Sequence, residues 1–221
     1  MAQFLPPMQA STRQEFDAYL DVLEAASGDA RVSSARKFEQ EWPRSELLPH
    51  TLYIEAEAHR LLGESKQALS AAERAVKAAK DHIPALVLLA ELVSNAATQA
   101  DQLSTAERYA QQAFDLLQAF RAPPSTSLET WEAAHARMQS RIFAARGLIA
   151  YKKGEISKAI QEFEAAEART PIPDAAVLYR LGKLYRETGR VPEAVQMMKR
   201  VESMHEPVLR GLAVKELREL Q

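Results

Sequence analysis

The sequence of 221 residues contains no cysteine, and this absence narrows the possible chemistry at once. Without thiols, the chain has no disulfide, no thiolate metal site and no cysteine nucleophile. It also lacks an excess of either charge, since 28 lysines and arginines face 30 acidic residues for a formal net charge of −2. A nucleic-acid-binding protein typically shows a basic excess or a basic stripe. We therefore expect no nucleic-acid partner.

Long apolar segments are missing as well. The sequence has no run of 18 apolar residues, which predicts that the chain does not insert into a membrane. Residues 1–7 have neither the basic region nor the hydrophobic core of a signal peptide. The sequence as written therefore predicts a cytoplasmic protein. A periplasmic location is the alternative if a signal peptide has been removed.

Motifs of catalysis and metal binding are also absent. The chain contains no HExxH, GxSxG, GxxxxGK[ST] or GxGxxG pattern. Glu132 and His135 have the E-x-x-H spacing of carboxylate-bridged metal sites, but such a site needs a second pair, which the sequence does not supply. We predict a protein that is not an enzyme and that holds no metal or cofactor.

The 7 glycines and 11 prolines divide the chain into segments with helical periodicity. The prolines fall between these segments or in the first turn of one, where proline is tolerated. Within the segments, apolar residues recur every three or four positions and do not alternate. This pattern predicts an all-α chain.

One spacing of small residues, 7, 5 and 7, occurs three times along the chain. The three sets are Ala56, Gly63, Ala68 and Ala75; Gly147, Gly154, Ala159 and Ala166; and Gly182, Gly189, Ala194 and Val201. The first and third members of a set are small enough for two helices to cross closely. The second is a glycine, which can take the left-handed conformation that ends a helix.

The clearest copy of the pattern is Ala145–Pro171, which also carries Phe163 and ends in a proline. The last copy adds Leu181 directly before Gly182. This order resembles the tetratricopeptide repeat (TPR) of bacterial proteins, a pair of helices with a period of about 34 residues. The resemblance implies a right-handed superhelix of stacked antiparallel helix hairpins, with about eleven helices in five hairpins and a cap. Arg146 stands where the repeat usually has leucine.

The predicted organisation begins with a flexible arm over residues 1–10 and a degenerate hairpin over 11–48, and it ends with a capping helix over 207–221. Between them, an array over 49–206 comprises hairpins at 49–82, 83–120, 128–173 and 175–206. The second hairpin has four additional residues in its turn, within Ser94–Ser104. In the third, the first helix starts near Leu128 and runs for some 25 residues. The last helix is expected to cap the array, and a monomer is favoured over a dimer.

In TPR proteins the first helices of the hairpins line a concave groove. Carried over to this chain, the groove positions are His50, Tyr53, Glu57, Arg60, Val87, Glu91, Arg141, Leu148, Tyr151, Tyr179, Lys183 and Arg186. The resemblance implies a non-catalytic protein–protein interaction scaffold that binds a peptide or a partner protein there, with an acidic portion near Lys183 and Arg186. Two alternatives remain open, a structural subunit of a larger cell-envelope assembly and a peptide or small-ligand sensor.

Overall fold

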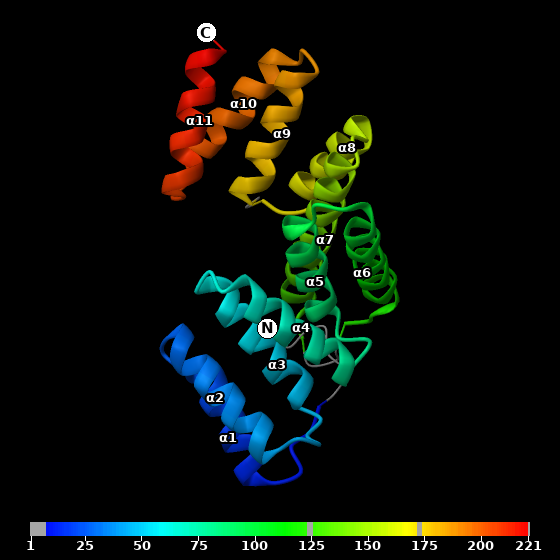
Figure 1. Ribbon diagram of the computed structural model, residues 1–221, viewed down its shortest axis with the longest axis vertical. Coiled ribbons are helices and arrows are strands. Elements are labelled where there is room, and N and C mark those ends of the chain that lie inside the picture. The colour runs from blue at the N-terminus through cyan, green and yellow to red at the C-terminus, as the bar shows by residue number, and fades with distance from the viewer. Residues whose placement is uncertain (1–7, 123–125, 172–173, 221) are drawn as a thin grey trace. The chain divides into compact units, whose positions relative to one another are not determined.

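The computed structural model describes residues 8–122, 126–171 and 174–220, which form eleven α-helices and no β-strand (Figure 1). The prediction of an all-α chain with eleven helices is confirmed. The helices are α1 (Arg13–Glu24), α2 (Gly28–Glu41), α3 (Leu48–Leu61), α4 (Ser65–Ala78), α5 (Ile83–Ala96), α6 (Ala100–Ala119), α7 (Leu128–Lys152), α8 (Ile156–Ala168), α9 (Ala175–Glu187), α10 (Val191–Glu202) and α11 (Pro207–Glu219).

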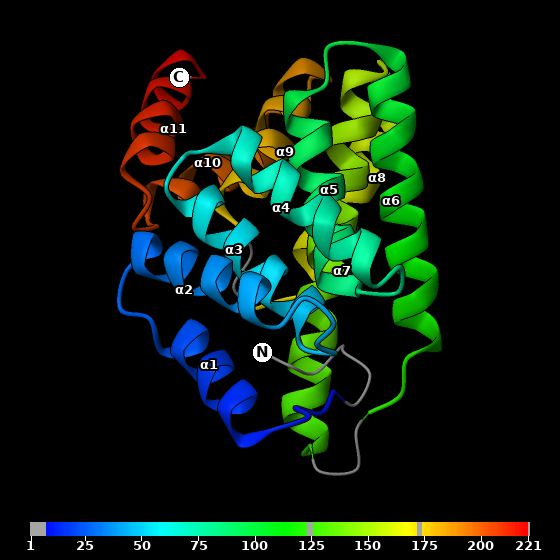
Figure 2. The same cartoon turned by 60° about the horizontal axis from the view of Figure 1, so that its bottom comes forward.

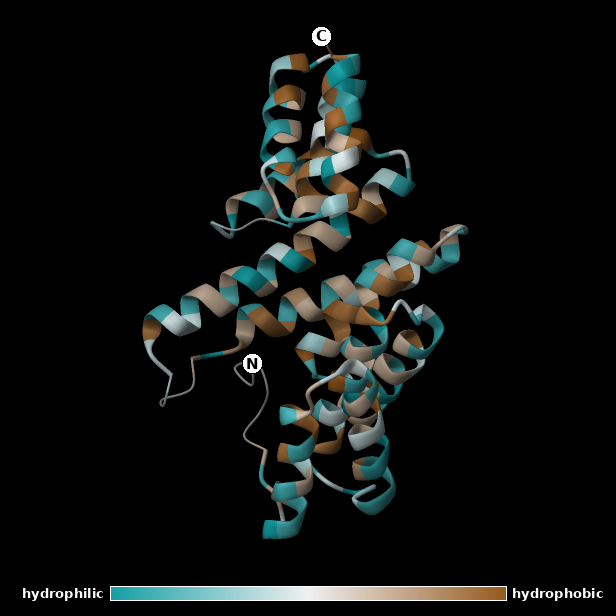
Figure 3. Ribbon diagram, turned by 90° about the vertical axis from the view of Figure 1, so that its left-hand side faces the viewer, coloured by the Kyte–Doolittle hydropathy of each residue, from teal (hydrophilic) through white to brown (hydrophobic). Residues whose placement is uncertain are grey.

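The helices pair into five hairpins, in which each odd-numbered helix packs against the even-numbered helix that follows it (Figures 1 and 2). The chain divides into two compact units, Met1–Ser127 with α1–α6 and Leu128–Gln221 with α7–α11. Hydrophilic and hydrophobic residues are mixed along the ribbons (Figure 3). Each unit has a hydrophobic core of its own, with Leu52 and Leu88 in that of the first unit and Phe163 and Leu178 in that of the second.

Three of the hairpins turn at a glycine with a positive φ angle. These angles are +77° at Gly63, +78° at Gly154 and +78° at Gly189. In each turn the glycine N–H donates to a carbonyl three residues earlier, as Gly154 does to Tyr151 at 2.9 Å. A residue with a Cβ would be strained in this conformation. The glycines predicted to end the first helices therefore do so.

The close crossing inside each hairpin also occurs where the sequence predicts it. A Cβ atom added to Gly147 would lie 2.7 Å from the ring of Phe163, and one added to Gly182 would lie 2.8 Å from Met198 Cε. In the first unit Ala56 is fully buried at the equivalent position. Small residues at these points let the two helices of a hairpin approach closely.

Two hairpins depart from the common length. The additional residues of 83–120 do not lengthen the turn, which spans only residues 97–99, but extend α6 to 20 residues. A capping box between Gln99 and Gln102 starts α6 early, and no glycine with a positive φ interrupts it. The other departure, the long α7, has 25 residues as predicted.

The two ends of the chain pack against the hairpins next to them. Of the predicted arm, residues 1–7 lie outside the described residues, whereas Met8 and Ala10 lie against the core of the first hairpin. The N–H of Gln9 donates to Glu46 Oε2 at 3.2 Å. At the other end α11 packs on α10 and α9, with Ala213 fully buried. This helix covers apolar surface of the last hairpin, as a cap does.

The crossing predicts a difference between two glycine substitutions. Gly147→Ala should lower the free energy of unfolding by about 1–3 kcal/mol, because the new methyl group overlaps the Phe163 ring. Gly211→Ala is the control, since a Cβ there meets nothing within 4 Å and alanine favours the helix by up to about 1 kcal/mol. Urea denaturation measures both. Equal effects of the two substitutions would contradict the close crossing.

Candidate binding surfaces

The predicted groove residues of the first unit are mostly closed off from solvent. His50 is 2% exposed, Tyr53 is 8% exposed and Val87 is fully buried. Of the others in this unit, Glu57 and Glu91 are half-buried and Arg60 is exposed. Arg60 Nε donates to Glu57 Oε2 at 2.8 Å. The structure thus differs from the sequence interpretation, which placed His50, Tyr53 and Val87 on an open surface.

An aromatic cluster explains why these positions are closed. Tyr19 from α1, His50 and Tyr53 from α3, and His82 at the start of α5 pack ring against ring, with centroids 5.5 to 6.0 Å apart. His82 Nδ1 also accepts a hydrogen bond from the N–H of Ala85 at 3.1 Å, so that His82 caps α5. The first helices of three consecutive hairpins are therefore joined by aromatic contacts.

Burial controls the electrostatics of this cluster. It lowers the pKa of His50 to about 4, and burial together with the charge of His50 lowers the pKa of His82 to about 3. Neither His50 Nδ1 nor His82 Nε2 has a hydrogen-bond partner among the described residues. Burial also raises the pKa of Tyr19 to about 12. All three side chains are therefore held neutral at neutral pH.

The groove residues of the second unit are more accessible. Tyr179, Lys183 and Arg186 lie three and four residues apart on α9, so they share one face of the helix. Each is half-buried, whereas Tyr151 is 40% exposed at the end of α7. Of the remaining predicted groove residues, Arg141 is half-buried and Leu148 belongs to the core.

The charges on this face of α9 are partly neutralised from within the chain. Arg186 forms ion pairs with Glu216 and Glu219 of α11, the second at 2.9 Å. Burial and the charges of Glu216 and Glu219 raise the pKa of Tyr179, against the smaller opposite effect of Lys183 and Arg186. Lys183 makes no ion pair with any described residue. Lys183 therefore carries a charge that no carboxylate of the described residues neutralises by a direct ion pair.

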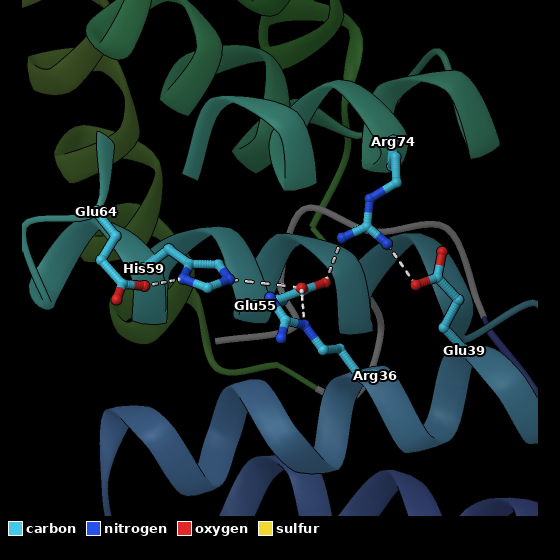
Figure 4. A network of polar contacts seen from close by, with 6 residues as sticks. All are labelled: Arg36, Glu39, Glu55, His59, Glu64 and Arg74. Carbon is cyan, nitrogen blue, oxygen red and sulfur yellow. Dashed lines mark hydrogen bonds and ion pairs between the residues drawn. The ribbon is translucent and has the colours of Figure 1, made fainter. Parts of the chain in front are cut away.

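A polar network that sequence interpretation missed links α2, α3 and α4 (Figure 4). Its centre is Glu55 of α3, whose side chain is only 2% exposed. Arg74 Nη2 lies 2.6 Å from Glu55 Oε2, Arg36 Nε lies 3.3 Å from Oε1, and His59 Nε2 lies 3.6 Å from Oε1. Glu55 thus receives contacts from both neighbouring helices.

The network extends outward on both sides of Glu55 (Figure 4). Arg74 also pairs with Glu39 of α2, and His59 Nδ1 lies 2.5 Å from Glu64 Oε2 in the turn before α4. Burial acts to lower the pKa of Arg74, but its hydrogen bonds and the charges of the two glutamates raise the pKa above its usual value. Beside the network, α2 and the ends of α3 and α4 enclose a cleft of about 610 Å³.

The sequence contained one signal for this network. Glu55 directly precedes the crossing residue Ala56, where the last repeat has Leu181 before Gly182. A charged residue at a normally apolar repeat position indicates that other polar side chains nearby neutralise its charge and bond to it. Arg146 is a second case. It lies half-buried near Glu162, with its guanidinium 5.9 Å from the Phe143 ring centroid.

The second unit repeats one part of this arrangement. Glu167 of α8 lies 2.7 Å from Arg200 of α10, just as Glu39 of α2 pairs with Arg74 of α4. In both units, a glutamate of one second helix therefore binds an arginine of the next second helix. The stacking of successive hairpins has the same ion-pair pattern in both units.

Two further features are absent among the described residues, a cluster of metal ligands and a helix able to span a membrane. Within residues 8–122, 126–171 and 174–220, no three His, Asp or Glu side chains gather at a spacing that could hold a metal ion. His135 lies against Trp131, with ring centroids 5.6 Å apart. None of the described helices has both the length and the apolar character needed to cross a bilayer.

Solved structures share this architecture. The chain is similar to MamA from Desulfovibrio magneticus RS-1 (TM-score 0.58, 15% identity, covering 97% of this chain and 99% of that one). It is also similar to a thermophilic TPR protein of Thermus thermophilus (TM-score 0.57, 20% identity, 93% and 98% covered). The chain has the tetratricopeptide-repeat fold. The predicted stack of helix hairpins is thereby confirmed.

A third similar structure is YrrB, described as a TPR protein with an unusual peptide-binding site (TM-score 0.51, 15% identity, 85% and 84% covered). No family model and no curated protein matches the sequence. At these identities the comparisons establish the TPR fold of the chain. A ligand has to be inferred from the surface residues of the chain itself.

The aromatic cluster predicts that the first unit is sensitive to acid. The folded pKa values of His50 and His82 lie below the unfolded value of about 6.5, so the unfolded chain binds more protons as the pH falls from about 6.5 to 4. Stability should therefore decrease over this range, by about 3 kcal/mol from His50 alone. Thermal melts between pH 7 and 4.5 measure the loss.

A double variant is the control for this prediction. His50→Phe with His82→Asn removes both titrating rings and keeps a side-chain acceptor to cap α5. Its melting temperature should fall less with decreasing pH than that of the wild type. An unchanged pH dependence in the double variant would show that the histidines are not the cause.

The polar network predicts unequal costs for two matched substitutions. Glu55→Gln removes the negative charge that Arg36 and Arg74 share. It should lower the free energy of unfolding by on the order of 3 kcal/mol, as breaking buried ion pairs does. Glu167→Gln removes a similar pair whose side chains are 30% and 36% exposed, and should cost about 1 kcal/mol or less. Similar values from urea denaturation would refute the central role of Glu55.

Proposed function

We propose that the protein is a non-catalytic scaffold that binds a peptide or a partner protein through the partly accessible face of α9, the first helix of the last hairpin. The observation that carries the proposal is that Tyr179, Lys183 and Arg186 share this face and remain half-buried, with Tyr179 at the edge of the core. The core of this unit is built from other residues of α9, such as Leu178, Leu181 and Leu184. The polar face of α9 is thus only partly covered, and Lys183 lies on it without an ion pair among the described residues.

The chemistry of this face supports a peptide with an acidic side chain as the ligand. A tyrosine offers a flat contact surface that loses little conformational entropy on binding, and an unpaired lysine attracts a carboxylate. Arg186 is already bound by Glu216 and Glu219, so an acidic side chain of the ligand is expected at Lys183. The similarity to YrrB, a TPR protein with a peptide-binding site, supports a peptide as the ligand class.

Peptide selection followed by charge reversal tests this function. Peptides selected from a displayed random library on the full-length protein should bind Lys183→Glu at least ten times more weakly than the wild type. Lys199→Glu, the same change at an exposed lysine of α10, should alter Kd less than twofold. Fluorescence anisotropy gives the Kd values. Equal affinities for the two variants would exclude the α9 face as the binding surface.

A further inference from the structure

The charges of the last helix are separated onto different sides. Glu216 and Glu219 of α11 face α9, where Arg186 neutralises them. Arg210 and Arg218 lie eight residues apart and share another side of the helix with Val214 between them. Along the described chain, neither arginine forms an ion pair. One side of α11 is therefore electrically balanced and another is basic.

The basic side is hollowed. A pocket of about 570 Å³ lies between α11 and the connection from α10, with Arg210, Lys215 and Arg218 among the residues that line it. Met204, Pro207 and Val214 supply apolar lining. Glu206 also lines it, so the pocket combines apolar contacts with three cations and one carboxylate, and its charge is basic on balance.

A glycine adds space at the centre of this surface. A Cβ atom at Gly211 would meet no atom within 4 Å, although the residue lies in the middle of α11. Elsewhere in this unit, Gly147 and Gly182 are the points where a second helix crosses the first. Gly211 thus offers a small residue on an open side of a helix, the arrangement that lets another helix approach closely.

The residues that line the pocket come from α11 and the connection before it, and the main helix contacts of α11 are with α10 and α9. Apolar side chains with a basic rim fit a helix that has one apolar face and acidic residues beside it. The rim cations would meet its carboxylates, and such pairs set partner choice and weaken with salt.

We infer that α11 is a docking site for an acidic amphipathic helix of a partner protein, which packs over Gly211 as α10 packs on α9. Its apolar face contacts Met204 and Val214, and its carboxylates pair with Arg210, Lys215 and Arg218. This site does not depend on the α9 face proposed above, and different substitutions test the two.

Selection against a charge-reversed variant tests the inference. A displayed peptide library is selected on the full-length protein and depleted on Arg210→Glu/Arg218→Glu. The peptides that remain should be acidic, with apolar residues three and four apart. They should bind the double variant at least ten times more weakly than the wild type, and their affinity should fall as the salt concentration rises. Lys77→Glu/Lys199→Glu, with the same change in net charge at exposed sites, should change Kd less than twofold.

Two further variants separate docking from folding and from the α9 face. Gly211→Gln fills the open space without a steric clash, so the melting temperature should stay or rise while peptide affinity falls at least tenfold. Lys183→Glu should leave the affinity of these peptides unchanged. If no selected peptide loses affinity for Lys183→Glu while these peptides still lose affinity for Arg210→Glu/Arg218→Glu, the proposed function is overturned and this site is not.

Three results would overturn the inference. The first is a set of selected peptides without acidic residues, or with equal affinity for both charge-reversed double variants. The second is a single-stranded RNA of 20 nucleotides that displaces the peptides and binds more tightly than they do. The third is a dimer in light scattering that the Arg210→Glu/Arg218→Glu variant loses, which would make a second copy of this chain the occupant.

Discussion

The close crossing of two helices at one small residue is the constraint on which the rest of the structure depends. At Gly147 and Gly182 the ring of Phe163 and the side chain of Met198 occupy the space that a Cβ would need. This contact fixes the distance and the register of the hairpin. A hairpin formed in this way still exposes apolar surface, and stacking on the next hairpin buries it. Repetition of one local contact thus produces each unit.

Stacking between hairpins uses charge as well as apolar surface. Glu39 with Arg74 in the first unit and Glu167 with Arg200 in the second join successive second helices. In the first unit Glu55 adds a buried carboxylate that contacts arginines of both neighbouring helices. A buried charge of this kind adds little net stability over an apolar residue, but any packing that separates it from its partners is costly. The network therefore favours one register of α2, α3 and α4.

The sequence predicted the features that depend on single residues with one physical role. Gly63, Gly154 and Gly189 have positive φ angles, and the 7, 5 and 7 spacing located the helix crossings. The length of α7 followed from continuous helical periodicity without a breaking residue. These features could be predicted because backbone conformation and close approach leave few choices of residue.

Features that depend on several residues far apart in the sequence were harder to predict. His50 and Tyr53 occupy positions that face a groove in the repeat, but contacts with Tyr19 and His82 from other hairpins close them. The additional residues after Ser94 entered α6 because Gln99 and Gln102 cap that helix, which a count of turn residues does not show. Glu55 was overlooked because its partners are 19 residues away on either side.

In the proposed function, the chain acts as a set of rigid hairpins whose polar faces recognise other proteins. Recognition of this kind needs no catalytic group, and the exposed parts of α9 and α11 differ in chemistry so that each selects its own ligand. Nuclear magnetic resonance on the full-length protein with a peptide that binds it tests this claim most directly. Amide shift changes should concentrate between Tyr179 and Arg186 or along α11. Changes confined to the cleft beside Glu55 and His59, with none on α9 or α11, would contradict it.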